Sequence, residues 1–93
     1  MDPEVQHERS RDRFIATVDG AVAVLNYKEQ GEMIYLVHTE VPLSMEGKGI
    51  GGKLAKAGLD YARDKGLKVV ARCPFVASYL QRHPEYQDFV QGE

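Results

Sequence analysis

The glycine-rich segment at positions 46–52, Glu-Gly-Lys-Gly-Ile-Gly-Gly, is the feature that most constrains how this chain folds. It follows a strand-like run at 33–41 and opens a helix-like run at 50–65. Its four glycines carry no Cβ atom, so a ligand can approach the backbone closely. The start of a helix also presents unpaired N–H groups and the positive end of the helix dipole. The segment therefore indicates a phosphate-binding site between a strand and a helix.

Size and charge narrow the classes of protein to which the chain can belong. We expect its 93 residues, 43% of them hydrophobic, to form a single domain over 1–93. A formal net charge of −2 gives no basic field for nucleic acid, and no apolar run is long enough to span a bilayer. The single cysteine, Cys73, excludes an internal disulfide, and zinc-ligand spacings are absent. We expect a cytoplasmic protein with a reduced thiol, no metal, and no nucleic-acid or membrane partner.

The hydrophobic pattern predicts a meander of strands followed by a crossover. The predicted strands are 5–8, 13–18, 21–28, 33–41 and 67–71. The predicted helices are 50–65 and 75–82, with a further turn over 85–90. Asp19-Gly20 and Gln30-Gly31 mark two chain reversals, and Pro42 ends the longest strand because it removes a ladder donor.

One side of the predicted 50–65 helix is suited to a sheet. Ile50, Leu54 and Gly58 recur at four-residue spacing, and Gly58 would let the helix lie close to the strands. Gly66 is the expected helix stop. The element order predicts an α/β (α+β) fold in which an antiparallel meander precedes one right-handed β-α-β crossover and the helices pack on a mixed sheet.

The glycine segment alone is compatible with simple turn chemistry and close packing, and also with several phosphate loops. A Walker-type loop is excluded because position 42 is proline and Lys48 is followed by Gly49 rather than by a hydroxyl residue. Gly47-x-Gly49-x-x-Gly52 formally matches the dinucleotide fingerprint. However, the chain after Gly52 is too short for the remaining strands, and Arg72 stands where that fingerprint needs an acidic residue.

A third kind of phosphate loop fits better. Gly49-x-Gly51 resembles the second half of the pyrophosphate motif of the GNAT N-acetyltransferase superfamily, [Gln/Arg]-x-x-Gly-x-[Gly/Ala], although Glu46 stands at its first position. The segments His-Thr-x-Val-Pro at 38–42 and Cys-x-Phe-Val at 73–76 extend the similarity. Together these motifs resemble a compact GNAT-like family over about 5–90. The resemblance implies a minimal GNAT-like fold, acetyl-CoA as coenzyme, and acetyl transfer to an amine acceptor.

The resemblance also assigns the coenzyme-binding residues. The backbone amides of the loop and of the helix start would hold the pyrophosphate, since unpaired N–H groups at a helix start also favour an anion in general. The strand before the loop would pair with the pantetheine arm. The residues so implied are Glu40, Val41, Gly47, Lys48, Gly49, Ile50, Gly51 and Gly52.

Three residues are candidates for catalysis, each with a structural alternative. Cys73 ends a strand and begins a helix, where the helix dipole and Arg72 would lower its pKa. It would act as base, acid or transient acetyl acceptor, or else be a small core residue. Glu40 is either a general base of the type used in this superfamily or a solvated strand residue. Tyr79 either protonates the leaving thiolate, as in many GNAT enzymes, or packs in the core.

Two further residues have alternatives of the same kind. His38 shares a predicted strand face with Leu36, so we expect a partly buried histidine. Arg82 is either a ligand of a coenzyme phosphate or a surface arginine.

The larger GNAT enzymes shape their acceptor pockets with additional helices and strands, which this chain is too short to contain. We therefore expect an acceptor site that is open, completed by a partner, or absent. The last possibility makes a non-catalytic coenzyme A-binding module the alternative function.

Overall fold

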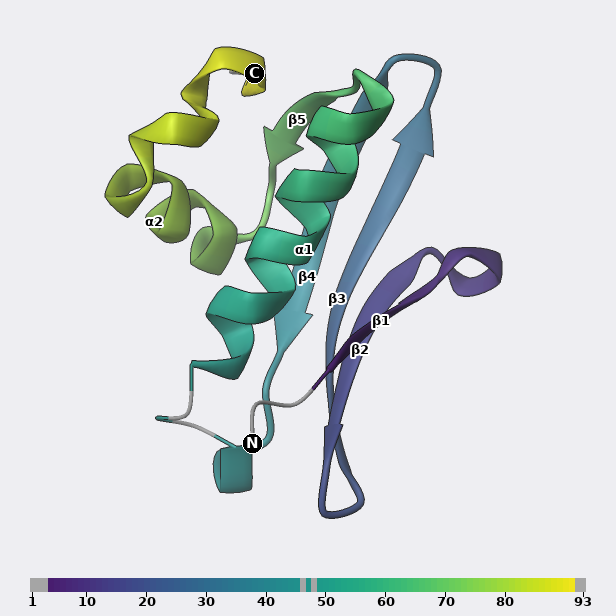
Figure 1. The fold of residues 1–93 in the computed structure, drawn as a ribbon, viewed down its shortest axis with the longest axis vertical. Coiled ribbons are helices and arrows are strands. Elements are labelled where there is room, and N and C mark those ends of the chain that lie inside the picture. The colour runs from purple at the N-terminus through teal and green to yellow at the C-terminus, as the bar shows by residue number, and fades with distance from the viewer. Residues whose placement is uncertain (1–3, 46, 48, 92–93) are drawn as a thin grey trace.

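The structure is a computed structural model that describes residues 4–45, 47 and 49–91. Its strands are β1 (Val5–Glu8), β2 (Arg13–Val18), β3 (Ala21–Gln30), β4 (Met33–Glu40) and β5 (Lys68–Ala71). Its helices are α1 (Ile50–Lys65) and α2 (Pro74–Arg82), with short 3-10 segments η1 (Arg9–Arg11), η2 (Leu43–Met45) and η3 (Pro84–Phe89). The strands form one sheet in the order β1-β2-β3-β4-β5 (Figure 1). Only β4 and β5 pair in parallel, which confirms the predicted meander and crossover.

Some boundaries differ from those predicted by a few residues. β3 continues to Gln30, which pairs with Met33, so the second reversal is at Gly31-Glu32 rather than at Gln30-Gly31. Gly31 has a φ of +58°, the left-handed conformation that such a tight turn requires. β4 ends one residue earlier than predicted, at Glu40, and α2 begins one residue earlier, at Pro74. Proline is well accommodated in the first turn of a helix because an N–H group there would have no intrahelical acceptor.

Helix α1 lies across one face of the sheet, and α2 lies beside it beyond β5 (Figure 1). The predicted stripe is buried: Ile50 and Leu54 are at most 1% exposed, and Gly58 is buried as well. A Cβ atom at Gly58 would lie 3.2 Å from the side chain of Leu25, which confirms that this glycine brings the helix close to the strands. Gly66 ends α1 in the left-handed conformation, as predicted.

A β-bulge in β4 decides which of its side chains face α1. Asn26 pairs with His38 and Tyr27 pairs with Leu36, so Val37 is the extra residue. Beyond the bulge, the inner face is continued by Thr39, which stands opposite the buried Leu25. The side chain of His38 is 58% exposed. The predicted partial burial of His38 is therefore wrong, because the bulge shifts the alternation by one residue.

The two parallel strands separate beyond Leu36. Their pairing ends where Leu36 meets Ala71, and the carbonyl of Leu36 then accepts the amides of both Arg72 and Cys73 at 3.0 Å. Cys73 is the N-cap residue of α2, where the chain leaves the sheet. The last residues of β4 consequently have no β5 partner, and their backbone borders a gap between the two strands.

Candidate active site

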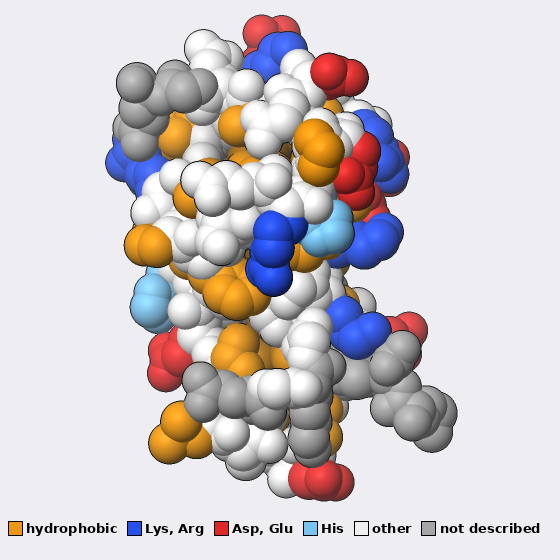
Figure 2. All heavy atoms as spheres, turned by 90° about the vertical axis from the view of Figure 1, so that its left-hand side faces the viewer, with side chains coloured by type: hydrophobic (Ala, Val, Ile, Leu, Met, Phe, Trp, Pro, Cys, Tyr) orange, Lys and Arg blue, Asp and Glu red, His pale blue; other side chains and the backbone are white. Residues whose placement is uncertain are grey.

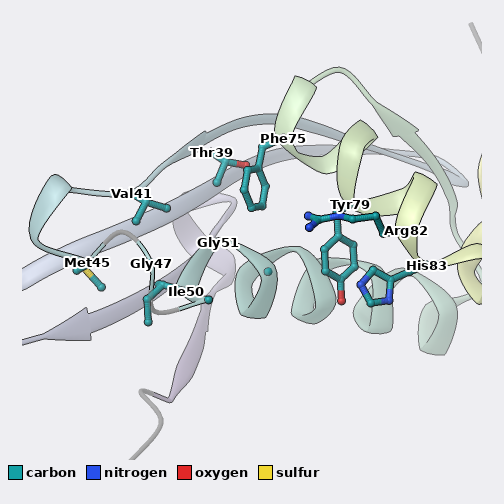
Figure 3. Close-up of a pocket in the computed structure, with 12 residues that line it drawn as sticks. Thr39, Val41, Met45, Gly47, Ile50, Gly51, Phe75, Tyr79, Arg82 and His83 are labelled. Carbon is teal, nitrogen blue, oxygen red and sulfur yellow. The ribbon is translucent and has the colours of Figure 1, made fainter.

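A cavity of about 570 Å³ lies between the end of β4, the start of α1 and one side of α2 (Figure 3). From the β4 side it is lined by Thr39, Val41 and Met45. The glycine loop and the start of α1 contribute Gly47, Gly49, Ile50, Gly51 and Gly52. The α2 side contributes Phe75, Tyr79, Arg82 and His83. The cavity thus occupies the place where the two parallel strands separate.

Most of the residues predicted to bind a coenzyme lie around this cavity. Those that line it are Val41, Gly47, Gly49, Ile50, Gly51 and Gly52. Lys48 and Glu46 lie outside the described residues. Glu40 is not among the lining residues, because strand alternation turns it away from the side of Thr39. Its side chain is 72% exposed, and its carboxylate lies 3.6 Å from Nε2 of His38.

The start of α1 presents free backbone amides to the cavity. Gly49 is the N-cap residue with a φ of +73°, and Gly47 has a φ of +81°, so both need the freedom of glycine. Among the described residues, the first amide bonded within the helix is that of Lys53, which donates to the carbonyl of Gly49 at 3.1 Å. Within the same part of the chain, the amides of residues 50–52 have no intrahelical acceptor, and the N-cap residue has no side chain to cap them. This arrangement suits an anion.

Two of the glycines also serve the contact between the helices. A Cβ atom at Gly51 would lie 2.5 Å from Cζ of Phe75, and one at Gly52 would lie 3.5 Å from the ring of Tyr79. Close packing, the structural alternative for the glycine segment, therefore explains Gly51, because the Phe75 ring occupies the space that a side chain at this position would need. Figure 3 shows this ring between Thr39 and the start of α1, so it divides the strand end of the cavity from the Tyr79 end.

Cys73 lies directly behind the wall of the cavity. The residue is 4% exposed, and its Sγ atom lies 3.2 Å from Oγ1 of Thr39, which lines the cavity. Burial raises the pKa of the thiol. Hydrogen bonds with Thr39 and with the Val76 and Phe75 amides lower the pKa by more than burial raises it, so the net pKa is below its ordinary value. These amides belong to the start of α2, so the predicted effect of the helix N-terminus is present.

Arg72 has a different environment from the one the sequence suggested. Its guanidinium lies over the ring of Tyr35, 4.8 Å from the ring centroid, rather than over the thiol of Cys73. Tyr79 lines the cavity, and burial raises the pKa of its phenol, which keeps the hydroxyl protonated as a potential donor.

Sequence reasoning missed four of the residues that line this site, which are Thr39, Met45, Phe75 and His83. Thr39 reaches the cavity only because of the bulge, and no local sequence pattern predicts this bulge. His83 lines the cavity with its ring stacked on Tyr79, at a centroid distance of 4.1 Å and an interplanar angle of 21°. The four-residue spacing of Tyr79 and His83 at the end of the predicted helix was the sequence signal that could have predicted their contact.

The cavity is free of acidic side chains among its described lining residues. Its charged or titratable groups are Tyr79, Arg82 and His83. On the molecular face turned toward the viewer in Figure 2, hydrophobic side chains run along the middle beside a basic one, while acidic side chains lie nearer the edges. Within the described residues, no group of three potential metal ligands is present. The site therefore suits an anionic ligand with an apolar portion.

A meander joined to one β-α-β unit, with parallel strands that separate beside a glycine-rich helix start, defines a GNAT-like domain. The sequence comparison agrees. A family model described as GCN5-related N-acetyl-transferase matches residues 13–89, and the chain belongs to this family.

Several relatives share most of the chain. Protein NATD1 of Mus musculus is 39% identical over 83 residues, which cover 86% of this chain and 76% of the relative. Protein NATD1 of Gallus gallus is 37% identical over 93 residues, covering 95% and 84%. A solution NMR structure of a "GCN5-like putative N-acetyltransferase" from Staphylococcus aureus superposes with a TM-score of 0.72 at 29% identity, covering 97% of this chain and 89% of that one. These matches agree with the compact GNAT-like resemblance of the sequence.

Within residues 4–45, 47 and 49–91, no helix combines the length and the apolar character needed to cross a membrane.

Proposed function

We propose that this protein transfers an acetyl group from acetyl-CoA to an amine. The observation that carries the proposal is a cavity lined by the start of α1, by the end of β4 and by Thr39, whose hydroxyl contacts the buried thiol of Cys73. The amides of residues 50–52 supply donors for a pyrophosphate. The family assignment supports the same coenzyme class.

The end of β4 is suited to the pantetheine arm. Beyond Leu36, the backbone of this strand has N–H and C=O groups that β5 does not engage, and the arm of coenzyme A contains amide groups that complement them. An arm bound along residues 39–41 would place its thioester near Thr39 and Cys73. A backbone N–H near Val41 is the proposed donor to the thioester oxygen as it becomes an oxyanion.

In the proposed reaction, the nitrogen of the amine attacks the thioester carbonyl carbon and forms the amide bond. The C–S bond breaks, coenzyme A leaves as a thiolate, and the nitrogen loses a proton. We assign proton transfers to Cys73, whose pKa is lowered, and to Tyr79, whose protonated phenol can neutralise the thiolate. Glu40 is proposed as the base for an amine that arrives from solvent, since its carboxylate is exposed.

A second candidate function is a coenzyme A-binding module without efficient catalysis. Two observations favour it. The described lining of the cavity contains no carboxylate, and the thiol of Cys73 is almost completely buried. Both functions require the same coenzyme, so binding and turnover must be measured separately.

We infer further that residues 1–93 act as one domain in the cytoplasm. The family match over most of the chain supports a single domain, and a lone unpaired thiol suits a reducing compartment. The proposed ligands are the coenzyme and the amine acceptor, with no metal, nucleic acid or membrane required.

Calorimetric titration with acetyl-CoA, coenzyme A and NADPH tests the site. We expect the two coenzyme A ligands to bind and NADPH not to bind; preferential NADPH binding would refute the assignment. Thiol release from acetyl-CoA is then followed with a panel of peptides and polyamines. Release that depends on an amine supports the transferase, whereas coenzyme binding with no release supports the binding module.

A further inference from the structure

A second hollow lies on the face of the sheet that is turned away from α1. It is lined by side chains of β3 and β4 and by the residue that follows β5, which are Lys28, Gln30, Tyr35, Val37 and Arg72. Strand alternation places this outer hollow on the side opposite Leu36, whose side chain faces Gly58 of α1. The described residues that line it are all different from those that line the active-site cavity.

The outer hollow is basic. It combines the ammonium group of Lys28 with the guanidinium group of Arg72, which lies over the Tyr35 ring at 4.8 Å from the centroid. Lys68 is exposed on the same side of β5, and the described lining contains no carboxylate. Because the whole chain has a formal net charge of −2, this local excess of positive charge stands out and is complementary to an acidic ligand.

Neutral groups of the outer hollow suit the same ligand. In the described part of the chain, the side chains of Lys28 and Gln30 and the hydroxyl of Tyr35 make no hydrogen bond with one another or with other residues. They are therefore donors that a carboxylate can engage. Val37 is 46% exposed, and it is the extra residue of the bulge in β4. The ligand thus meets an apolar contact beside the charged ones.

The size of the outer hollow favours one side chain of a larger partner. Its volume is about 210 Å³, whereas sites for whole small molecules usually measure about 300 to 1,000 Å³. A nucleic acid would need a wider basic field than these three cations provide. A polypeptide can place one acidic side chain in the hollow and an apolar one on Val37.

We propose that the outer hollow binds an acidic segment of a partner protein. A glutamate or aspartate side chain enters the hollow and accepts hydrogen bonds from Lys28 and Tyr35, beside the positive charge of Arg72. In an extended segment, residues two positions apart point to the same side. An apolar side chain two positions from the acidic one would therefore contact Val37. This inference does not depend on the proposed function.

The test uses a fluorescein-labelled peptide of repeated Glu-Ser-Val-Ser units and measures its binding by fluorescence anisotropy. The wild-type protein is expected to bind it about tenfold more tightly than the same peptide with glutamine in place of glutamate. Replacing valine by serine in the peptide should weaken binding about threefold, and added salt should weaken binding of the glutamate peptide. Backbone amide NMR shifts should change mainly in residues 28–37 and at Arg72.

Two variants with matched controls locate the contact. Lys28→Gln should weaken binding about threefold to fivefold, the range for an exposed charge pair. Lys65→Gln, which removes an exposed lysine at the end of α1, should leave binding unchanged. Val37→Thr should remove the preference for valine in the peptide. Val22→Thr should keep this preference, because Val22 is 44% exposed but lies at the other end of β3.

Four results would overturn the proposal. They are equal affinity for the glutamate and glutamine peptides, no binding by the folded wild-type protein, equal weakening in Lys28→Gln and Lys65→Gln, and tighter binding of a single-stranded oligonucleotide than of the peptide. Competition between the peptide and coenzyme A would place the peptide in the active-site cavity and would also overturn it. A protein that binds the peptide in this way but does not bind coenzyme A would refute the proposed function alone.

Discussion

The Sγ atom of Cys73 lies 3.2 Å from Oγ1 of Thr39, next to the point at which β4 and β5 separate. The two residues are 34 positions apart in the chain. They meet because the bulge at Val37 turns Thr39 inward and because Cys73 begins α2 immediately after β5. The hydroxyl thus stands between a buried thiol and the cavity.

Thr39→Val is expected to raise the pKa of Cys73. The hydrogen bond with the Thr39 hydroxyl is one of those that lower this pKa against the effect of burial. Valine has nearly the same side-chain shape as threonine but lacks the hydroxyl. Titration of the thiolate by its ultraviolet absorbance measures the pKa, with Cys73→Ala as the blank because it removes the only cysteine. Thr17→Val, at an exposed position of β2, is the control. An unchanged pKa in Thr39→Val would show that the hydroxyl does not stabilise the thiolate.

Gly49→Glu is expected to abolish coenzyme A binding. The substitution places a side chain on a left-handed residue, at a cost of about 1 to 2 kcal/mol, and adds a negative charge beside the amides of α1. Gly20→Glu imposes the same kind of strain at a φ of +82° in the turn between β2 and β3, away from the cavity. Calorimetry should therefore show binding by Gly20→Glu alone. Equal binding by both variants would place the coenzyme elsewhere.

Gly51→Ala is expected to destabilise the protein, although alanine favours a helix by about 0.5 to 1 kcal/mol. The new Cβ atom would lie 2.5 Å from Cζ of Phe75, and such overpacking costs about 1 to 3 kcal/mol. In a Phe75→Ala background, the same change should instead be stabilising, because the ring is absent. Urea denaturation of the four proteins in this cycle gives the coupling free energy. A coupling of zero would mean that the ring moves aside without cost.

Stability is expected to fall in acid partly because of His7. Burial, and then the charge of Arg9, lower the pKa of His7 from 6.5, and Nε2 of His7 lies 2.6 Å from the hydroxyl of Tyr27. The unfolded chain therefore binds a proton more readily than the folded one. The contribution of neutral His7 to stability is complete above the pKa of this residue in the unfolded chain, and it is lost as the pH falls through the pKa in the folded protein.

The variant that tests this contribution is His7→Phe, which keeps an aromatic ring against Phe14 but cannot be protonated. Its free energy of unfolding should be lower at neutral pH and should depend less steeply on pH between neutral and mildly acidic conditions. His38→Gln removes an exposed histidine and serves as the control. If both variants keep the wild-type slope, the titrating group lies elsewhere.

Tyr86→Phe is expected to lower the free energy of unfolding by about 1 to 2 kcal/mol, the range for a hydrogen bond to a charged group at a partly exposed site. The hydroxyl of Tyr86 donates to Oδ1 of Asp60 at 2.9 Å and ties η3 to α1. Burial and this carboxylate raise the pKa of Tyr86 to about 12. Tyr35→Phe, which loses a hydroxyl without a hydrogen bond in the described structure, is the control. Equal stabilities of the two variants would show that the Tyr86–Asp60 hydrogen bond does not stabilise the fold.

The sequence predicted most of the fold because the relevant signals are local. Strand alternation, the Asp19-Gly20 turn and the Gly66 helix stop depend on side chains a few positions apart, and all three are present. The spacing of Ile50 and Leu54 identified the buried side of α1 for the same reason. The glycine segment also indicated the helix start whose amides face the cavity, because left-handed residues at such a position strongly favour glycine.

The placement of the remaining site residues was decided by tertiary structure. The bulge in β4 exchanged the expected positions of His38 and Thr39 and turned Glu40 toward solvent. Only the packing of α2 against α1 put Phe75 on Gly51 and brought Tyr79 and His83 to the cavity. Such contacts join residues far apart in the chain, and a shift of one residue in a strand reverses every side chain beyond it. The amino-acid order therefore determined the elements and the anion-binding helix start, whereas strand register and helix packing selected the side chains that surround it.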